Sequence, residues 1–295
     1  MYFSREGERY RQSEAPVPGW VFELRPPLIE CNGEEEAMTR EGAHFRGAGF
    51  LAEERIEELG GGLFSVERQL VNDGVGTRWF KLIMEGITGF IPEKYTIPCV
   101  SYDGNRRSGG HEPQGTAVEG RNWIFAYDRS GIPSCTVTED AANVAAMFAS
   151  DREEASLRSS CSLVETGEGR FLHRIYYPVT EAPFTYSDHD VMSERYDEYL
   201  TLRPGESFRC RFHLFFGVPE WRSFGCATLL NRVLELFPFR HEPVLTPEEV
   251  YEAALANSRF LMFDYNGHRM FRNAMRNSPE DDSIVFPDKI IEAGW

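Results

Sequence analysis

Short runs of alternating or aromatic-rich residues recur from residue 16 to about residue 218, and glycine, proline, asparagine and aspartate separate them. Regularly spaced short strands with turn residues between them are typical of an antiparallel sandwich, whereas βαβ units would place a helical segment between successive strands. The sequence therefore predicts a mainly β fold, a large antiparallel β-sandwich or supersandwich. The predicted strands are Trp20–Leu24, His44–Phe50, Leu63–Leu70, Thr77–Met84, Tyr95–Ser101, Asn122–Tyr127, Cys135–Thr138, Val144–Phe148, Phe171–Tyr177, Tyr196–Leu202 and Phe208–Phe216.

The sharpest local signal is the turn Arg203-Pro204-Gly205-Glu206, which lies between two runs of alternating apolar residues. Proline suits the first central position of a type II turn, and glycine suits the second, where φ is positive. We therefore predict a β-hairpin across this turn. The segment Asn72-Asp73-Gly74 predicts a second hairpin upstream.

The pattern changes after Gly217, where apolar residues take up helical spacing. The first helical run, from Trp221 to Phe237, ends before Pro238, which cannot continue a helix. A second helix is predicted to begin at Thr246, because Thr246-Pro247-Glu248-Glu249 is a capping box with proline at the first helical position. We expect this helix to continue through Met262. The chain is thus predicted to hold a β-sandwich domain over 1–218 and helices over 219–295.

The composition excludes several classes of protein. With 31 Lys+Arg and 47 Asp+Glu, the net charge of −16 argues against non-specific binding to nucleic acid or to an anionic membrane. No apolar run reaches the length of about 18 residues that a membrane span needs, and the first residues lack the apolar core of a secretory signal. The six cysteines form no CxxC pair and no zinc-type cluster with histidine. We therefore expect a cytoplasmic protein with reduced thiols and with neither a metal nor another cofactor.

One long polar loop carries the candidate binding site. After an apolar strand that begins at Tyr95, about twenty residues rich in Gly, Arg, Asp, Asn, His and Glu precede an aromatic strand. Loops this long in a compact sandwich are often functional. The mixture suits sugar recognition, because hydroxyls need donors and acceptors while the sugar ring needs an aromatic platform. The predicted substrate-binding residues are Tyr102, Asp103, Asn105, Arg106, Arg107, His111, Glu112 and Trp123. The alternative is a glycine-rich loop with incidental polarity.

A second polar group lies on the strands around Asn72-Asp73-Gly74. Arg68, Asn72, Arg78 and Trp79 are candidates to face a cleft. The alternative is a hairpin with solvated basic residues.

Three segments together resemble the N-terminal half of bacterial six-hairpin glycosidase-type proteins: RQLVNDGVGTRWFKL, YTIPCVSYDGN, and LTLRPGESFRCRFHL with its following helices and EAGW ending. The resemblance covers most of residues 60–295. It implies a β-supersandwich, a linker and the start of an (α/α)6 barrel, with the catalytic carboxylates in the remainder of the barrel. The apolar run that ends at Trp295 either docks on the sandwich or marks a chain cut within a larger protein.

The resemblance implies that this chain is the non-catalytic N-terminal part of a glycoside hydrolase and contributes contacts to a carbohydrate substrate. It assigns no catalytic residue, and it leaves open the sugar, the linkage and the retaining or inverting outcome. The partner would be the catalytic barrel. A self-contained mutarotase-like epimerase is an alternative, with His173 or His213 as a candidate acid. The third alternative is a carbohydrate-binding or assembly domain without chemistry, in which exposed apolar helix faces form a homo-oligomer.

Overall fold

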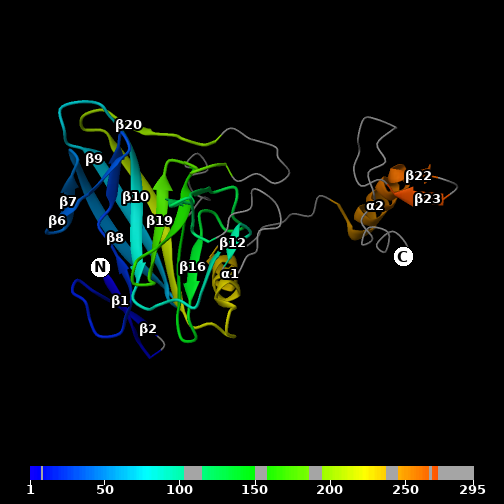
Figure 1. Ribbon diagram of the computed structural model, residues 1–295, viewed down its shortest axis with the longest axis horizontal. Coiled ribbons are helices and arrows are strands. Elements are labelled where there is room, and N and C mark those ends of the chain that lie inside the picture. Colours follow the sequence, from blue (N-terminus) through cyan, green and yellow to red (C-terminus); the bar gives the residue numbers. More distant parts are fainter. Residues whose placement is uncertain are drawn as a thin grey trace. The chain divides into compact units, whose positions relative to one another are not determined.

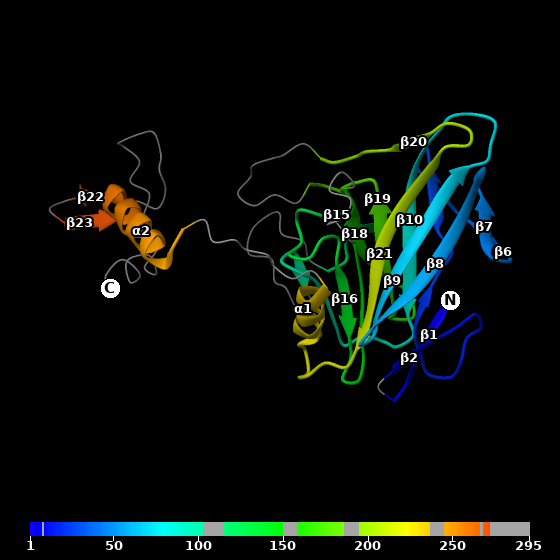
Figure 2. The ribbon, with the colours of Figure 1, turned by 180° about the vertical axis from the view of Figure 1, so that it is seen from behind.

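The computed structural model describes residues 1–7, 9–102, 115–149, 158–185, 195–236, 245–265 and 268–271. The chain divides into two compact units, Met1–Phe237 and Pro238–Trp295. The first unit is a sandwich of two large sheets, which Figures 1 and 2 show from opposite sides. All the strand pairs of both sheets are antiparallel in the described residues, so the predicted antiparallel β-sandwich is confirmed.

The first sheet has ten strands, and β10 lies near its centre with four neighbours. The order is β15-β18-β19-β10-β3-β1-β2, while β20 and β4 also pair with β10, and β5 pairs with β4. The strands are β1 (Tyr2–Glu6), β2 (Arg9–Ser13), β3 (Trp20–Leu24), β4 (Leu28–Cys31), β5 (Glu34–Ala37), β10 (Arg78–Thr88), β15 (Phe125–Ala126), β18 (Ser160–Glu165), β19 (Phe171–Tyr177) and β20 (Leu200–Leu202).

The second sheet has nine strands in the order β12-β11-β16-β17-β21-β9-β8-β7-β6. Its strands are β6 (Thr39–Glu41), β7 (His44–Gly47), β8 (Phe50–Gly60), β9 (Leu63–Asn72), β11 (Lys94–Ile97), β12 (Ser101–Tyr102), β16 (Thr136–Glu139), β17 (Val144–Ala149) and β21 (Ser207–Gly217). A small separate ribbon pairs β13 (Ala117–Val118) with β14 (Arg121–Asn122).

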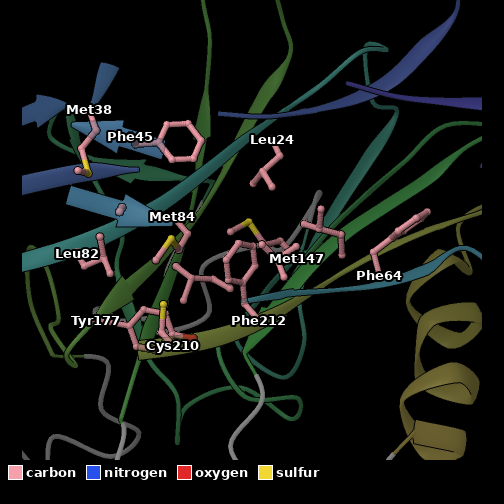
Figure 3. Close-up of a cluster of buried hydrophobic side chains, with 14 of the residues drawn as sticks. Leu24, Met38, Phe45, Phe64, Leu82, Met84, Met147, Tyr177, Cys210 and Phe212 are labelled. Atoms are coloured by element: carbon pink, nitrogen blue, oxygen red, sulfur yellow. The ribbon is translucent and has the colours of Figure 1, made fainter. Parts of the chain in front are cut away.

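The main core lies between the two sheets, where each strand contributes every second side chain. Figure 3 shows Leu82, Met84 and Tyr177 of the ten-stranded sheet meeting Met147 and Phe212 of the nine-stranded sheet. All five are buried. Burying a large apolar side chain stabilises the fold by about 1.5–3 kcal/mol, so this layer holds the sheets together.

The turn at residues 203–206 forms as predicted, but it does not close a hairpin. Gly205 has a φ of +79°, and the amide of Glu206 donates to the carbonyl of Arg203 at 3.0 Å. However, β20 before the turn pairs with β10 of one sheet, and β21 after it pairs with β9 and β17 of the other. The turn is therefore a corner that joins the two sheets. An alternating apolar pattern looks the same in a hairpin and in such a corner, because one face is buried in both.

The predicted hairpin after Asn72 is also a corner, since β9 and β10 belong to different sheets. The fully buried Asn72 side chain joins the two corners. Its amide nitrogen donates to the carbonyls of Gly76 at 2.8 Å and Leu202 at 2.9 Å, and its side-chain oxygen accepts from the amide of Gly74 at 3.0 Å. Asn72 thus has a structural role rather than a position in a cleft.

Two helices follow the strands of the sandwich. Helix α1 (Gly225–Leu236) lies beside β16 in both ribbon views, and its buried Leu229 packs against Phe148 and Phe215 of the nine-stranded sheet. For this reason the first compact unit continues to Phe237, past the boundary expected at residue 218.

Helix α2 (Pro247–Leu261) has the predicted capping box. The backbone of Glu249 donates to the Thr246 hydroxyl at 3.2 Å, and the Thr246 backbone donates to the Glu249 carboxylate at 2.7 Å. The chain then turns into β22 (Met262–Tyr265) and β23 (His268–Phe271), so the expected helical state of Met262 is wrong. Neither α1 nor α2, the helices of the described ranges, is long and apolar enough to cross a membrane.

Candidate functional site

The candidate site lies on the face of the ten-stranded sheet that points away from the nine-stranded sheet, which we call the outer face. Strand β10 defines it, because Phe80, Leu82 and Met84 enter the core while Lys81 and Glu85 alternate onto the opposite side. Two charged side chains in a largely apolar central strand are unusual. Burying a charge is costly unless it is paired, so both residues need partners.

Lys81 is 5% exposed and has partners from three other segments. Its ammonium donates to Asp197 Oδ1 at 2.7 Å and to Thr180 Oγ1 at 3.3 Å, and it lies 3.7 Å from Glu30 Oε2. Burial alone would lower the pKa of Lys81, but the hydrogen bond to Asp197 and the nearby carboxylates outweigh it, so the pKa is raised. The same hydrogen bond lowers the pKa of Asp197. The pair is therefore charged at neutral pH.

Two exposed aromatic rings flank this ion pair. Trp79 is 70% exposed and is directly opposite Thr201 of β20, so both residues belong to the outer face. Tyr199 lies two residues before Thr201 and shares that face. It is 41% exposed, and the Lys81 ammonium is 4.5 Å from its ring centroid. The arrangement thus combines aromatic surface open to solvent with fixed hydrogen-bonding groups.

A second ion cluster continues the outer face along β10. Glu85 Oε1 accepts from Arg25 at 2.9 Å, and Glu85 Oε2 accepts from Arg174 of β19 at 2.7 Å. Arg174 also donates to Glu35 at 3.2 Å. Register explains the contact, because Glu85 and Arg174 are directly opposite each other on neighbouring strands. Both oxygens of Glu85 are therefore committed to guanidinium groups.

The loop residues predicted to bind substrate fall mostly outside the described residues. Tyr102 ends β12, where it is paired with Thr96. Trp123 is 6% exposed, and its ring stacks on Phe125 with centroids 5.7 Å apart. The remaining six, Asp103, Asn105, Arg106, Arg107, His111 and Glu112, lie outside the described ranges. Sugar contact by this loop stays a prediction.

Arg68, another candidate from the sequence, lies in the interior. It is 1% exposed and donates to Glu54 Oε2 at 2.6 Å and to the carbonyl of Arg25 at 2.7 Å. Its guanidinium also lies over the rings of Phe45 and Phe212. Arg78 lies over the Phe50 ring, 5.7 Å from its centroid. Of the four candidates on these strands, only Trp79 is largely exposed on the outer face.

The two histidines considered for an epimerase are buried. His173 lies between the sheets, with Nδ1 2.9 Å from Thr136 Oγ1 and Nε2 3.0 Å from Thr138 Oγ1. Burial lowers the pKa of His173 to about 3. His213 stacks on Phe148, and burial lowers its pKa to about 4. His173 is fully buried and His213 is 3% exposed, so neither ring lies on an open sheet surface, and an acid role for either stays a prediction.

Sequence reasoning missed Lys81, Glu85, Asp197 and Tyr199. The available signal was the alternation of Trp79, Lys81 and Glu85 through an apolar strand. Among the residues that the structure describes, no three His, Cys, Asp or Glu side chains gather as a metal site would require.

No family model matches this chain, and no curated protein matches it. Among solved structures, an Escherichia coli K12 protein assigned provisionally as an aldose 1-epimerase is similar at 13% identity over 74% of this chain and 79% of its own, with a TM-score of 0.35. A polysaccharide lyase is similar at 12% identity over 72% of this chain and 28% of its own, with a TM-score of 0.26.

The galactosidase domain of an α-galactosidase–sucrose kinase is similar at 12% identity over 67% of this chain and 28% of its own, with a TM-score of 0.22. All three names refer to carbohydrate enzymes. The chain spans less than a third of the second and third proteins. Similarity this weak transfers no property of these proteins to the chain.

Proposed function

We propose that this chain binds carbohydrate on the outer face and supplies substrate contacts to a glycoside hydrolase without supplying its catalytic pair. The observation that carries the proposal is the largely exposed Trp79 ring beside the Lys81–Asp197 ion pair and Tyr199. The sequence resemblance to the sandwich part of six-hairpin glycosidase-type proteins supports the finer assignment.

The chemistry of this patch suits a sugar. The C–H face of a pyranose packs against an aromatic ring, while its hydroxyls exchange hydrogen bonds with polar groups at the ring edge. Here Trp79 and Tyr199 offer the aromatic surface. Asp197 offers an acceptor that Lys81 already holds in place, so little side-chain entropy is lost when a hydroxyl donates to it.

The same geometry favours contact over catalysis. A glycosidase general acid must carry a proton into the reaction. On the outer face, Glu85 accepts from two arginines and Asp197 accepts from Lys81, so these carboxylates are fixed acceptors. The loop between Tyr102 and Trp123 is proposed as a further source of contacts to the same substrate.

Trp79→Ala tests the proposal, with Trp221→Ala as the matched control. Trp221 is 68% exposed and lies before α1, outside the ten-stranded sheet. Binding of a panel of oligosaccharides is measured by calorimetry and by tryptophan fluorescence. Loss of one stacking ring is expected to weaken binding about tenfold, equivalent to about 1.4 kcal/mol, whereas the control binds like the wild type.

Two outcomes would contradict the proposal. Equal weakening by both variants, or no binding to any oligosaccharide, would remove the outer face as a sugar site. Robust turnover of aryl glycosides by the 295-residue chain would contradict the non-catalytic assignment.

An assembly role is the second candidate, and α1 provides its observation. Leu229 packs inward, while Leu230 and Leu234, one helical turn apart, are exposed on the helix. Contiguous exposed apolar side chains are typical of an interface. Sedimentation showing a monomer at all concentrations would count against self-association.

A further inference from the structure

An arginine without an ion pair lies on the outer face close to Trp79. Arg203 is exposed and comes two residues after Thr201, which is directly opposite Trp79 on the neighbouring strand. Diagonal neighbours of this kind have Cα atoms about 7–8 Å apart, within reach of a long side chain. In the described part of the chain, the Arg203 guanidinium has neither an ion pair nor a hydrogen bond. It can therefore reach a ligand that stacks on Trp79.

The carboxylate of the same turn binds the backbone rather than this guanidinium. Glu206 Oε2 accepts from the backbone amide of Arg203 at 2.7 Å. A guanidinium has five N–H donors in a planar fork, and those of Arg203 have no acceptor among the described residues. An arriving anion therefore has no protein carboxylate to displace from them.

The opposite end of the aromatic surface has its charges already paired. Tyr199 is the other diagonal neighbour of Trp79, and the ammonium beside its ring is held by Asp197. Asp197 and Arg203 are six residues apart, which spans about 20 Å in an extended segment. This exceeds the screening length of about 8 Å at physiological ionic strength, so the Asp197 charge opposes an anion at Arg203 only weakly.

We infer that the outer face prefers acidic sugars, with the carboxylate of a uronic acid bound by Arg203 while the sugar ring stacks on Trp79. The guanidinium fork matches a carboxylate through two parallel hydrogen bonds. Other units of the same oligosaccharide can donate hydroxyls to Asp197. This inference rests on the proposed function, because it assumes that the sugar binds at Trp79.

The test compares neutral oligosaccharides with uronic-acid oligomers of the same linkage and length, in glucose–glucuronate, galactose–galacturonate and mannose–mannuronate pairs. In the pair that binds, the uronic-acid member is expected to bind about tenfold more tightly, since it gains a charge-assisted bidentate contact. Raising the salt concentration from about 50 mM to about 500 mM should weaken its binding about threefold. The neutral member should be unaffected, because salt screens only charged ligands.

Arg203→Gln removes the charge and should lower the affinity for the uronate about tenfold, so that both members of the pair bind alike. Arg203→Lys keeps the charge without the planar fork, so part of the preference should remain.

Arg9→Gln is the matched control. Arg9 is also exposed on the ten-stranded sheet, in β2, and has no ion pair in the described ranges. Figure 1 places β2 and β20 at opposite ends of the sandwich. This variant removes one positive charge far from Trp79 and should keep the wild-type preference.

The outcomes separate the inference from the proposed function. A uronate that binds no more tightly than its neutral counterpart, with sensitivity to Trp79→Ala, overturns the inference while sugar binding at Trp79 stands. A preference for the uronate that survives Arg203→Gln also overturns it, since another cation would then hold the carboxylate. An absence of binding by every sugar overturns both.

Discussion

The interior of the sandwich and its outer face each hold a buried cation with a carboxylate partner. Arg68 of β9 points into the interior, and its partner Glu54 is 7% exposed. Lys81 of β10 points to the outer face, and its partner Asp197 is 43% exposed beside two accessible aromatic rings. The interior pair is closed on all sides, whereas the outer pair keeps part of its carboxylate in contact with solvent.

This difference separates a structural ion pair from one that can serve a ligand. A buried ion pair must find all its hydrogen-bond partners within the protein. Arg68 donates to Glu54, to a backbone carbonyl and to the Met84 sulfur. An open pair can gain a further hydrogen bond when a ligand arrives. The two regions should therefore respond differently to substitution.

The largest effect is expected from Arg68→Met, which leaves the Glu54 charge buried and uncompensated. We expect the free energy of unfolding to fall by about 3–5 kcal/mol, measured by urea denaturation. Arg209→Met, on the exposed side of β21, is the control and should change stability by less than about 0.5 kcal/mol. A loss of stability as small as that of this control would show that the Arg68–Glu54 pair is not shielded from solvent. The Arg68→Met/Glu54→Met double variant should regain most of the loss.

The buried His173 leads to a prediction about how the free energy of unfolding depends on pH. Its pKa in the fold is about 3, against an ordinary value of 6.5, so the unfolded state binds more protons between these values. Stability is therefore complete above about pH 6.5 and decreases as the pH falls towards 3. At pH 4.5 the contribution lost is roughly 3 kcal/mol.

His173→Gln should flatten the decrease in stability between pH 6.5 and 4.5 relative to the wild type, as measured by denaturation at several pH values. His44, whose side chain is 46% exposed, supplies the control, and His44→Gln should keep the wild-type profile. Parallel curves for the wild type and His173→Gln would show that the histidine is not held neutral by the fold.

A smaller loss of stability is expected for the outer pair. Lys81→Met removes a buried cation, but Asp197 can regain water on its exposed side, so we expect a loss of about 1–2 kcal/mol. Sugar binding should weaken in parallel because Asp197 is no longer held in place. A loss as large as that of Arg68→Met would show that the outer pair is closed as well.

The smallest effect on stability is expected for Trp79→Ala. Because the ring is largely exposed, its removal should change the free energy of unfolding by less than about 0.5 kcal/mol while it weakens sugar binding. Denaturation midpoints and binding constants are measured on the same sample. A clear loss of stability would indicate that the ring supports the sheet instead of a ligand.

The sequence predicts the buried strands of the fold better than the largely exposed ones. Strands β3 and β19 have the predicted limits, because both are runs rich in aromatic and apolar residues. In contrast, the acidic segments Glu34–Glu36 and Glu53–Glu58 fall outside the predicted strands, yet they lie in β5 and β8. These strands are largely exposed, so little burial pattern marks them.

The candidate site was predictable only in part. Trp79 was among the candidates because it lies on one of the two predicted strands joined by Asn72-Asp73-Gly74. Its neighbours were not, since Lys81 and Asp197 are 116 residues apart in the chain and nothing local to either reveals the pairing. The two sheet corners were predicted as hairpins for the same reason. Long-range packing decides which strands pair, and the residues near a turn do not reveal it.

The position of β21 has a consequence for how the chain folds during synthesis. It pairs with β9 on one side and with β17 on the other, so it is the only link between β6–β9 and β11–β17 within the described nine-stranded sheet. The Arg209–Gln69 contact across this link spans 140 residues. The two halves of the sheet can therefore join only after β21 has been synthesised, so we expect closure of the core to be a late step in folding.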